Sequence, residues 1–463
     1  MKKNIPLGVS RLMAVILIAI VSFGLTFFRL ESDGPDLVIN RSINKPVKPD
    51  IYLPKQQKIA DISPLMAQSR IGKELKLIAI GGKLMAGYRD GGLYRQSQLT
   101  AFPNLLAQQM GIQNFKSPLF DPVEGNGTGY LILDSTEQLL SWQKITNNIG
   151  TLSNKPYRLK KFKGGIPDNL SFPELNLNIK SFENESFPTP AYPQRYEFIS
   201  YYYRILSESE EGQKSLNDIL KNIDADIALY HEGYDLYLGL AQFPRNISIE
   251  AGGLFSSFNP NIAYRNVKQL IQKGTKVVLF TVPQVVNFPF LHIHSSGELL
   301  RKVKTIYARS HNNHSIPNQL DERALFLPTN NVRSLVLGSS KIGLSRNQPL
   351  MDEDVITPEE IASLKSVTMY NELYVRQLAK LYNLPIVDLE EIYQRILAGQ
   401  YYTEDGLYIN PSFPSGNFFS ADGMNPSGVG QAVIANETIK VMNAHYHIDI
   451  PLIEIKKWAA LLK

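Results

Sequence analysis

Residues 75–91 of this 463-residue chain read LKLIAIGGKLMAGYRDG. The first six are mostly apolar and are followed directly by two glycines, the pattern of a buried strand that ends in a sharp turn. Other apolar runs of strand length lie at 227–230, 277–282 and 384–387, and amphipathic stretches lie at 101–111, 216–223, 267–273 and 362–382. Strands that alternate with helices predict an α/β fold, with a parallel sheet and helices on both faces. Such sheets bind ligands at the carboxyl ends of their strands, where this turn would lie.

The turn resembles the first block of the SGNH, or GDSL-type, hydrolase superfamily, which reads Gly-Asp-Ser-Leu. In one branch, common in Bacteroidetes-type bacteria, the block continues as Thr-Ala-Gly-Tyr-x-Asp-Gly. Gly82 stands at the Asp position and Lys83 at the position of the nucleophilic Ser. The same register continues through Leu93-Tyr94, Gln98, Phe102-Pro103 and Leu105-Leu106-Ala107-x-Gln109. The resemblance spans about 75–453 and implies a three-layer, flavodoxin-like sheet.

A second block near the C-terminus is equally specific. Residues 419–430 read FSADGMNPSGVG and resemble the family's last block, Asp-x-x-His-Pro. Asp422 stands where the triad acid belongs, but Asn425 replaces the general-base His. Two of the three triad positions are therefore substituted.

Two middle blocks rest on fewer residues. Residues 165–168 resemble the family's Val-Pro-Gly turn, with Asp168 at the oxyanion-hole Gly. Residues 232–235 resemble Gly-x-Asn-Asp, with Tyr234 replacing the oxyanion-hole Asn. Asp235 and Asp388 match retained family positions, and we expect them to be structural.

These substitutions remove the usual chemistry. A serine hydrolase needs a hydroxyl, an imidazole that takes its proton, a carboxylate and oxyanion donors. Lys83 is an ammonium at neutral pH, and Asn425 cannot act as a base. We expect Lys83 to pair with Asp422, Asp168 or both, because a buried carboxylate without its His requires a cation. His231 is the histidine that could substitute as a base.

Two classes of function remain open. The first is a catalytically degenerate protein with a binding or scaffold role in the cell envelope and a protein or glycan partner. The second is an extracytoplasmic esterase or deacetylase of glycans or lipids that uses unorthodox residues. Neither class requires a cofactor or metal. Nucleic-acid binding is not expected, because four of the five net positive charges come from Lys2, Lys3, Arg11 and Arg29.

The N-terminus indicates a membrane anchor. Residues 12–28 are apolar and uncharged, with basic residues on both sides, and no convincing signal-peptide cleavage site follows. We expect 1–30 to be a signal anchor with the basic end in the cytoplasm, although a cleaved signal peptide is the alternative. Residues 31–68 are rich in Pro and predict a tether. Residues 69–463 would form the periplasmic domain, with insertions near 114–180 and 289–351.

Other candidates have plain structural alternatives. His292 and His294 could face one side of a strand as metal ligands, but no acidic cluster accompanies them. His311 and His314 lie in a polar stretch typical of a loop. Tyr192, Tyr196 and residues 201–203 could stack on a glycan, but packing in the core is favoured. The chain has no Cys, which excludes disulfides and a thiolate nucleophile.

Overall fold

The structure is a computed structural model that describes residues 38–462, apart from 56–57, 70, 73, 135–138, 153–154, 174–200, 206–215, 243–259 and 311–312. These described residues belong to a compact unit that covers Asp33–Lys463. The expected anchor at 1–30 lies outside them. Among the residues described, no helix has both the length and the apolar character needed to cross a membrane.

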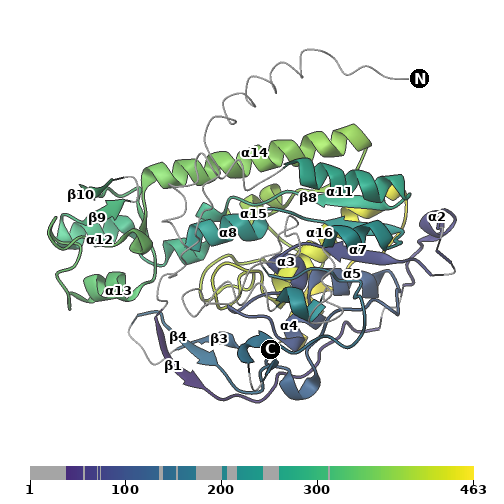
Figure 1. The fold of residues 1–463 in the computed structure, drawn as a ribbon, viewed down its shortest axis with the longest axis horizontal. Coiled ribbons are helices and arrows are strands. Elements are labelled where there is room, and N and C mark those ends of the chain that lie inside the picture. The colour runs from purple at the N-terminus through teal and green to yellow at the C-terminus, as the bar shows by residue number, and fades with distance from the viewer. Residues whose placement is uncertain are drawn as a thin grey trace, which may run out of the picture. The chain divides into compact units, whose positions relative to one another are not determined.

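A parallel sheet forms the centre of the unit (Figure 1). Its strand order is β13 (Ile386–Val387), β8 (Lys276–Phe280), β7 (Ile227–Tyr230) and β2 (Leu77–Ile80). Each strand falls within or beside an apolar run of the sequence, so the four predicted strands are confirmed. The registers place the ends of neighbouring strands together, since Ile80 pairs with Tyr230 and Tyr230 with Leu279.

A fifth segment extends the sheet beyond β2. The N–H of Ala79 donates to Asp168 O at 2.9 Å, and the N–H of Leu170 donates to Ala79 O at 2.8 Å. Residues 168–172 thus run parallel to β2 on its open edge. Counted in chain order, the five strands lie as second, first, third, fourth and fifth.

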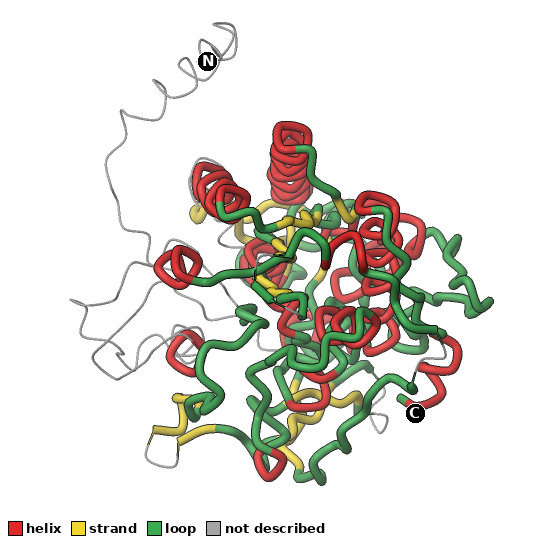
Figure 2. Tube along the Cα trace, turned by 90° about the vertical axis from the view of Figure 1, so that its right-hand side faces the viewer, coloured by secondary structure: helices red, strands yellow, loops and turns green. Residues whose placement is uncertain are grey.

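Helices cover both faces of the sheet because its side chains alternate between two cores. Leu77 and Ala79 enter a core with α5 (Phe102–Gln109), α8 (Tyr234–Gln242) and α16 (Gly428–Tyr446). Ile78 and Ile80 enter a second core with α7 (Leu216–Asn222), α11 (Pro260–Gln272) and the C-terminal half of α14 (Pro358–Tyr382). Helices lie on either side of the strands at the centre of the unit (Figure 1, Figure 2), and the predicted helices are confirmed.

A smaller sheet uses the region expected to be a tether. β1 (Ile39–Ile43) pairs with β4 (Trp142–Ile145), which also pairs with β3 (Tyr130–Leu133). Further along, Gln96 Nε2 donates to Pro49 O at 2.9 Å, and Arg95 forms an ion pair with Asp50 at 2.7 Å. The tether prediction is therefore wrong for this stretch, because its backbone carbonyls and one carboxylate bind the domain.

The segment at 289–351 folds around its own small core. It contains α12 (Ser296–Val303), β9 (Tyr307–Ser310), β10 (Asn313–Gln319), β11 (Leu325–Phe326) and α13 (Asn330–Leu337). Their buried apolar side chains form a cluster separate from the two cores of the sheet. The other elements are α2 (Ser63–Met66), α3 (Lys83–Ala86), α4 (Arg95–Leu99), α15 (Leu389–Leu397), α17 (Ile455–Leu461), β5 (Thr151–Leu152), β6 (Lys155–Leu159), β12 (Val355–Ile356) and the 3-10 helices η1 (Pro122–Glu124), η2 (Val285–Asn287), η3 (Pro289–His292) and η4 (Asp352–Asp354).

Candidate functional site

The first and last sequence blocks meet beyond the carboxyl end of β2. The N–H of Asp90 donates to Ser420 Oγ at 2.9 Å, and the N–H of Ala421 donates to Asp90 Oδ1 at 2.8 Å. A third bond runs from the N–H of Gly91 to Asp422 Oδ2 at 3.0 Å. Segments about 330 residues apart are thus held together at the edge where α/β sheets bind ligands.

Asp422 is the centre of this junction. Its carboxylate accepts five hydrogen bonds of 2.8–3.0 Å, from the N–H groups of Gly91, Met424 and Asn425, from Ser420 Oγ and from Asn425 Nδ2. Burial raises the pKa of Asp422 above its usual range, although these donors oppose the shift. The donors come from both blocks, so this carboxylate organises the loop whether or not it has a chemical role.

Asn425 contacts the carboxylate that a general-base His would contact. Its Nδ2 donates to Asp422 Oδ2 at 2.9 Å, so an amide holds this carboxylate. The Oδ1 of Asn425 is buried and has no hydrogen-bond partner among the described residues. An amide has no basic nitrogen, and this position therefore cannot take a proton from a nucleophile.

Lys83 begins the short helix α3, and Asp235 caps that helix from α8. The N–H of Lys83 lies 2.8 and 3.0 Å from the two carboxylate oxygens of Asp235. A Cβ on Gly82 would lie 2.2 Å from one of these oxygens. Glycine at 82 is therefore required by the space that the Asp235 carboxylate occupies. This contact is structural, as expected for Asp235.

The expected ion pair of Lys83 with Asp422 or Asp168 does not form. The ammonium of Lys83 lies over the ring of Tyr88, with Nζ 5.6 Å from the ring centroid. The carboxylate of Asp168 instead pairs with Lys76 Nζ at 3.2 Å. The Asp422 carboxylate is satisfied by amides and a hydroxyl, so it does not need the cation that we expected.

Asp168 lies away from the site, toward the start of β2. The residue of that segment beside the end of β2 is Phe172, whose N–H donates to Gly81 O at 3.2 Å. Asp168, expected at an oxyanion position, therefore lies beside Ala79, and Phe172 lies beside Gly81. A second apolar-Pro pair, Phe172-Pro173, was the signal in the sequence that could have identified the segment next to Gly81.

Tyr234 does reach the junction, at the start of α8. Its side chain is 1% exposed, and its hydroxyl faces that of Tyr393. Burial raises its pKa well above the ordinary value, and the nearby groups Tyr393 and Asp422 raise it further. The same burial raises the pKa of Tyr393, a residue of α15 that the sequence analysis did not identify. No local motif marks Tyr393, because it reaches the site through the packing of α15.

His231 is buried between aromatic rings. Its ring centroid lies 5.6 Å from that of Tyr234 and 5.9 Å from that of Phe280. Burial lowers the pKa of His231 to about 3. A base with this pKa holds a proton poorly near neutral pH, which argues against His231 as a substitute general base.

The remaining candidates have structural contacts. His292 Nε2 lies 2.9 Å from Val286 O, and burial lowers the pKa of His294 to about 4. Asp388 caps α15 through the N–H of Glu391 and forms an ion pair with Arg376. Tyr201 and Tyr202 belong to the core, as favoured, whereas Tyr192, Tyr196, His311 and the side chain of His314 lie outside the described residues.

The described part of the chain contains no cluster of side chains suited to hold a metal ion. Within it, no three side chains of His, Asp or Glu are grouped as metal ligands would be. Comparison of the chain with protein-family models, with curated proteins and with solved structures gives no match.

Proposed function

We propose that this protein is a catalytically degenerate relative of the SGNH hydrolases with a binding or scaffold role in the cell envelope. The observation that carries the proposal is the contact of Asn425 Nδ2 with Asp422 Oδ2 at 2.9 Å. In a hydrolase of this family an imidazole would occupy that place, and the amide cannot replace its chemistry. Lys83 at the nucleophile position supports the same conclusion.

The arrangement of the chain also supports the proposed family. The strand order second, first, third, fourth, fifth is that of flavodoxin-like sheets, in which the site lies between the first and third strands. Here those strands are β2 and β7, and Lys83 and Tyr234 follow their carboxyl ends.

Burial argues further against catalysis at this junction. Lys83, Tyr234, Asp422 and Asn425 are each at most 8% exposed. A substrate would have to displace packed side chains to reach them. Tyr234 fills the oxyanion region with a ring, and its hydroxyl stays protonated because burial raises its pKa.

The proposed location is the outer face of the cytoplasmic membrane. It rests on the apolar residues 12–28 and their basic flanks. Residues 38–55 pack on the domain, so the seven residues 31–37 would join the proposed anchor to the folded unit. The binding partner would then be another envelope component, protein or glycan.

Hydrolysis of aryl acetates by the full-length chain tests the proposal. The parent protein should release no more product than the Lys341→Ser variant. This control removes an exposed lysine that could react with the ester independently of the site. Lys83→Ser/Asn425→His restores both missing groups, and its imidazole would lie within reach of Asp422. Any gain in rate over the parent would support descent from a hydrolase.

The opposite result would also be informative. Turnover by the parent that disappears in Lys83→Ala, but persists in Lys341→Ser, would refute a degenerate site. It would favour the alternative function, an esterase or deacetylase with an unorthodox nucleophile. Thermal unfolding of each variant must match the parent for either conclusion to hold.

A further inference from the structure

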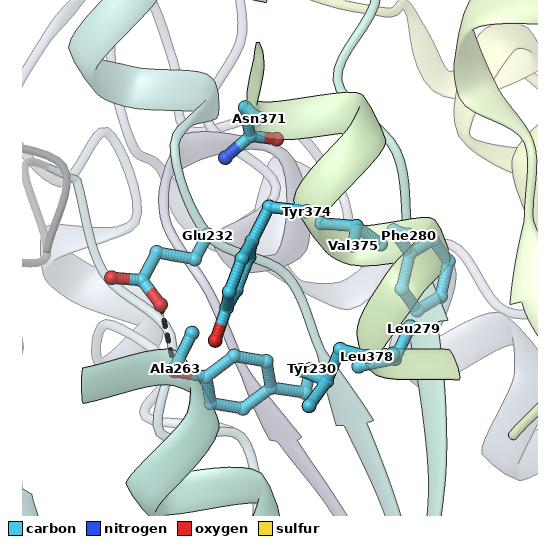
Figure 3. A pocket seen from close by; sticks show the side chains of 9 residues that line it. All are labelled: Tyr230, Glu232, Ala263, Leu279, Phe280, Asn371, Tyr374, Val375 and Leu378. Carbon is cyan, nitrogen blue, oxygen red and sulfur yellow. Dashed lines mark hydrogen bonds between the residues drawn. The ribbon is translucent and has the colours of Figure 1, made fainter. Parts of the chain in front are cut away.

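The pocket beneath α14 is too small for a ligand. Figure 3 shows it at the ends of β7 and β8, with a largely apolar wall. The Glu232 carboxylate at this wall accepts a hydrogen bond of 2.8 Å from the hydroxyl of Tyr230. The enclosed part of the pocket measures about 10 Å³, which is room for about one water molecule. A stronger candidate for binding a partner lies on the surface of the described unit.

The surface around β1 and β4 has a concentrated positive charge. Residues 38–48 contain three Lys or Arg residues and residues 142–167 contain six, and neither segment contains Asp or Glu. The whole chain has a net charge of +5, so the other residues together are negative. Pairing of β1 with β4 brings the two basic segments together, and these strands lie side by side in Figure 1.

Hydrogen bonds and an ion pair hold the two segments around the turn of η1. The N–H of Lys45 donates to Asn147 Oδ1 at 2.9 Å, and Asn126 Nδ2 donates to Lys45 O at 3.2 Å. The ammonium of Lys160 forms an ion pair with Glu124 of η1. Lysines that are more than 100 residues apart in the chain are therefore brought to one part of the surface.

The exposed cations of this region form what we call the basic patch. It consists of Arg41, Lys45, Lys144, Lys160, Lys161 and Lys163, and all six side chains are exposed. Among the described residues, only Lys160 of these six has a carboxylate partner. Like charges on one part of a surface repel one another, and an anionic partner relieves that repulsion.

Two apolar side chains accompany the basic patch. Val123 of η1 is 73% exposed, and Ile166 is 46% exposed, three residues after Lys163. Val123 lies next to the second basic segment, since Asn148 Nδ2 donates to Val123 O at 3.1 Å. Exposed apolar side chains are common by themselves, but beside cations they match the boundary between lipid headgroups and acyl chains. The combination favours an anionic lipid surface over a soluble polyanion, which offers the apolar groups no partner.

The length of the chain before β1 supports the same partner. Under the proposed membrane location, the seven residues 31–37 separate the anchor from the folded unit. Seven residues span no more than about 25 Å, so the start of β1 stays close to the bilayer. A tether gives a second contact a high effective concentration, so a patch with a modest affinity for lipid can dock.

We propose that the basic patch docks on the anionic headgroups of the bilayer that holds the chain, with Val123 and Ile166 at the headgroup boundary. Lys and Arg are attracted to anionic lipid within about one Debye length, so high salt should weaken the contact. The inference rests on the proposed membrane location, and it deepens the proposed function by naming the surface that faces the membrane.

Lysine acylation of the full-length chain in lipid nanodiscs tests this inference. The discs contain either phosphatidylcholine alone or about 30% of the anionic lipid phosphatidylglycerol. Mass spectrometry measures the labelling rates of Lys45, Lys144, Lys161 and Lys163. We expect these rates to be about 5-fold lower in the anionic discs, and equal in the two discs at about 0.5 M salt. Lys341, an exposed residue outside the patch, should be labelled equally in both discs.

Charge reversal connects the protection to the basic patch. In Lys161→Glu/Lys163→Glu, the labelling of Lys45 and Lys144 should no longer depend on the charge of the lipid. Neither substituted lysine forms an ion pair within the described part of the chain, so the fold should tolerate both changes.

The control variant is Lys341→Glu/Lys365→Glu. It makes the same change of charge at exposed positions outside the patch, and Lys45 and Lys144 should remain protected as in the parent. Loss of protection in both variants alike would show that only the total charge matters and would overturn a specific face.

The outcomes also separate the docking from the proposed location. A chain that enters the discs but is labelled equally in both lipids would overturn the docking and leave the location standing. A chain that does not enter the discs would overturn the location and the docking with it. Protection by soluble heparin in neutral discs, without protection by anionic lipid, would identify a polymer as the partner and overturn the lipid surface.

Discussion

At the scale of single residues, the contacts of a neighbour can determine which residue a position accepts. Gly82 is the clearest case, because the Asp235 carboxylate occupies the space that a side chain at 82 would need. We expect Gly82→Ala to lower the free energy of unfolding by about 1–3 kcal/mol, since the carboxylate that caps α3 would have to move. Urea unfolding measures the change.

Gly239 provides the matched control for that substitution. It lies within α8, and a Cβ there would meet no atom within 4 Å. Gly239→Ala should therefore stabilise the chain by up to about 1 kcal/mol, the helix-propensity difference. Equal effects of the two substitutions would contradict the packing described around Gly82.

The raised pKa of Glu232 predicts that the stability of the fold depends on pH. Its pKa rises from 4.5 to about 7 in the folded chain, mainly through burial, so the folded state binds the proton more tightly than the unfolded state. The stability from this group is present below the unfolded pKa and is lost as the pH rises through about 7. Because the Glu232 side chain is partly exposed, the free energy of unfolding should fall by about 2 kcal/mol over this pH range.

Glu232→Gln should abolish this component. The difference in unfolding free energy between about pH 5 and about pH 8 should be about 1–2 kcal/mol smaller in the variant than in the parent. The control is Glu322→Gln at an exposed position, which should keep the parental dependence. A variant with the same dependence as the parent would mean that Glu232 titrates as an ordinary surface acid.

At the scale of elements, β1 and the residues after it are part of the fold. Besides the pairing of β1 with β4, Asn126 Nδ2 and Gln96 Nε2 donate to carbonyls of Lys45 and Pro49. A chain that begins at Asp61 would lose the β1 pairing and these two contacts, and it would leave the Gln96 amide without its acceptor. Its free energy of unfolding should be about 2–4 kcal/mol below that of a chain beginning at Asp33.

Thermal and urea unfolding of the two shortened chains check this expectation. The chain from Asp33 should match the full-length protein, because it retains the whole compact unit. If the chain from Asp61 were equally stable, residues 38–55 would be a tether after all.

At the scale of the whole molecule, separate cores should open separately. The strands β2, β7 and β8 are fully buried between two cores, whereas the segment 289–351 packs around its own smaller cluster. Hydrogen exchange should therefore be slowest for the amides of these strands. The amides of α12 and α13 should exchange through openings of lower free energy. Equal protection of both regions would indicate one cooperative unit.

The sequence by itself determined the four parallel strands and the helices beside them. Apolar runs and helical periodicity are local properties, because each segment must bury one face or both. The same logic placed Lys83 and Tyr234 at one edge of the sheet, since both follow strands that proved to be neighbours.

Only the tertiary structure decided which side chains meet there. Phe172, and not Asp168, lies beside Gly81. Strand pairing fixes this register, and a short apolar-Pro motif cannot specify it. Five donors from two segments about 330 residues apart satisfy the Asp422 carboxylate. The small pocket between the end of β7 and α14 likewise depends on segments far apart in the chain, so no local pattern could reveal it. Burial and pairing between distant segments are set by packing, and packing is not encoded in any one stretch of residues.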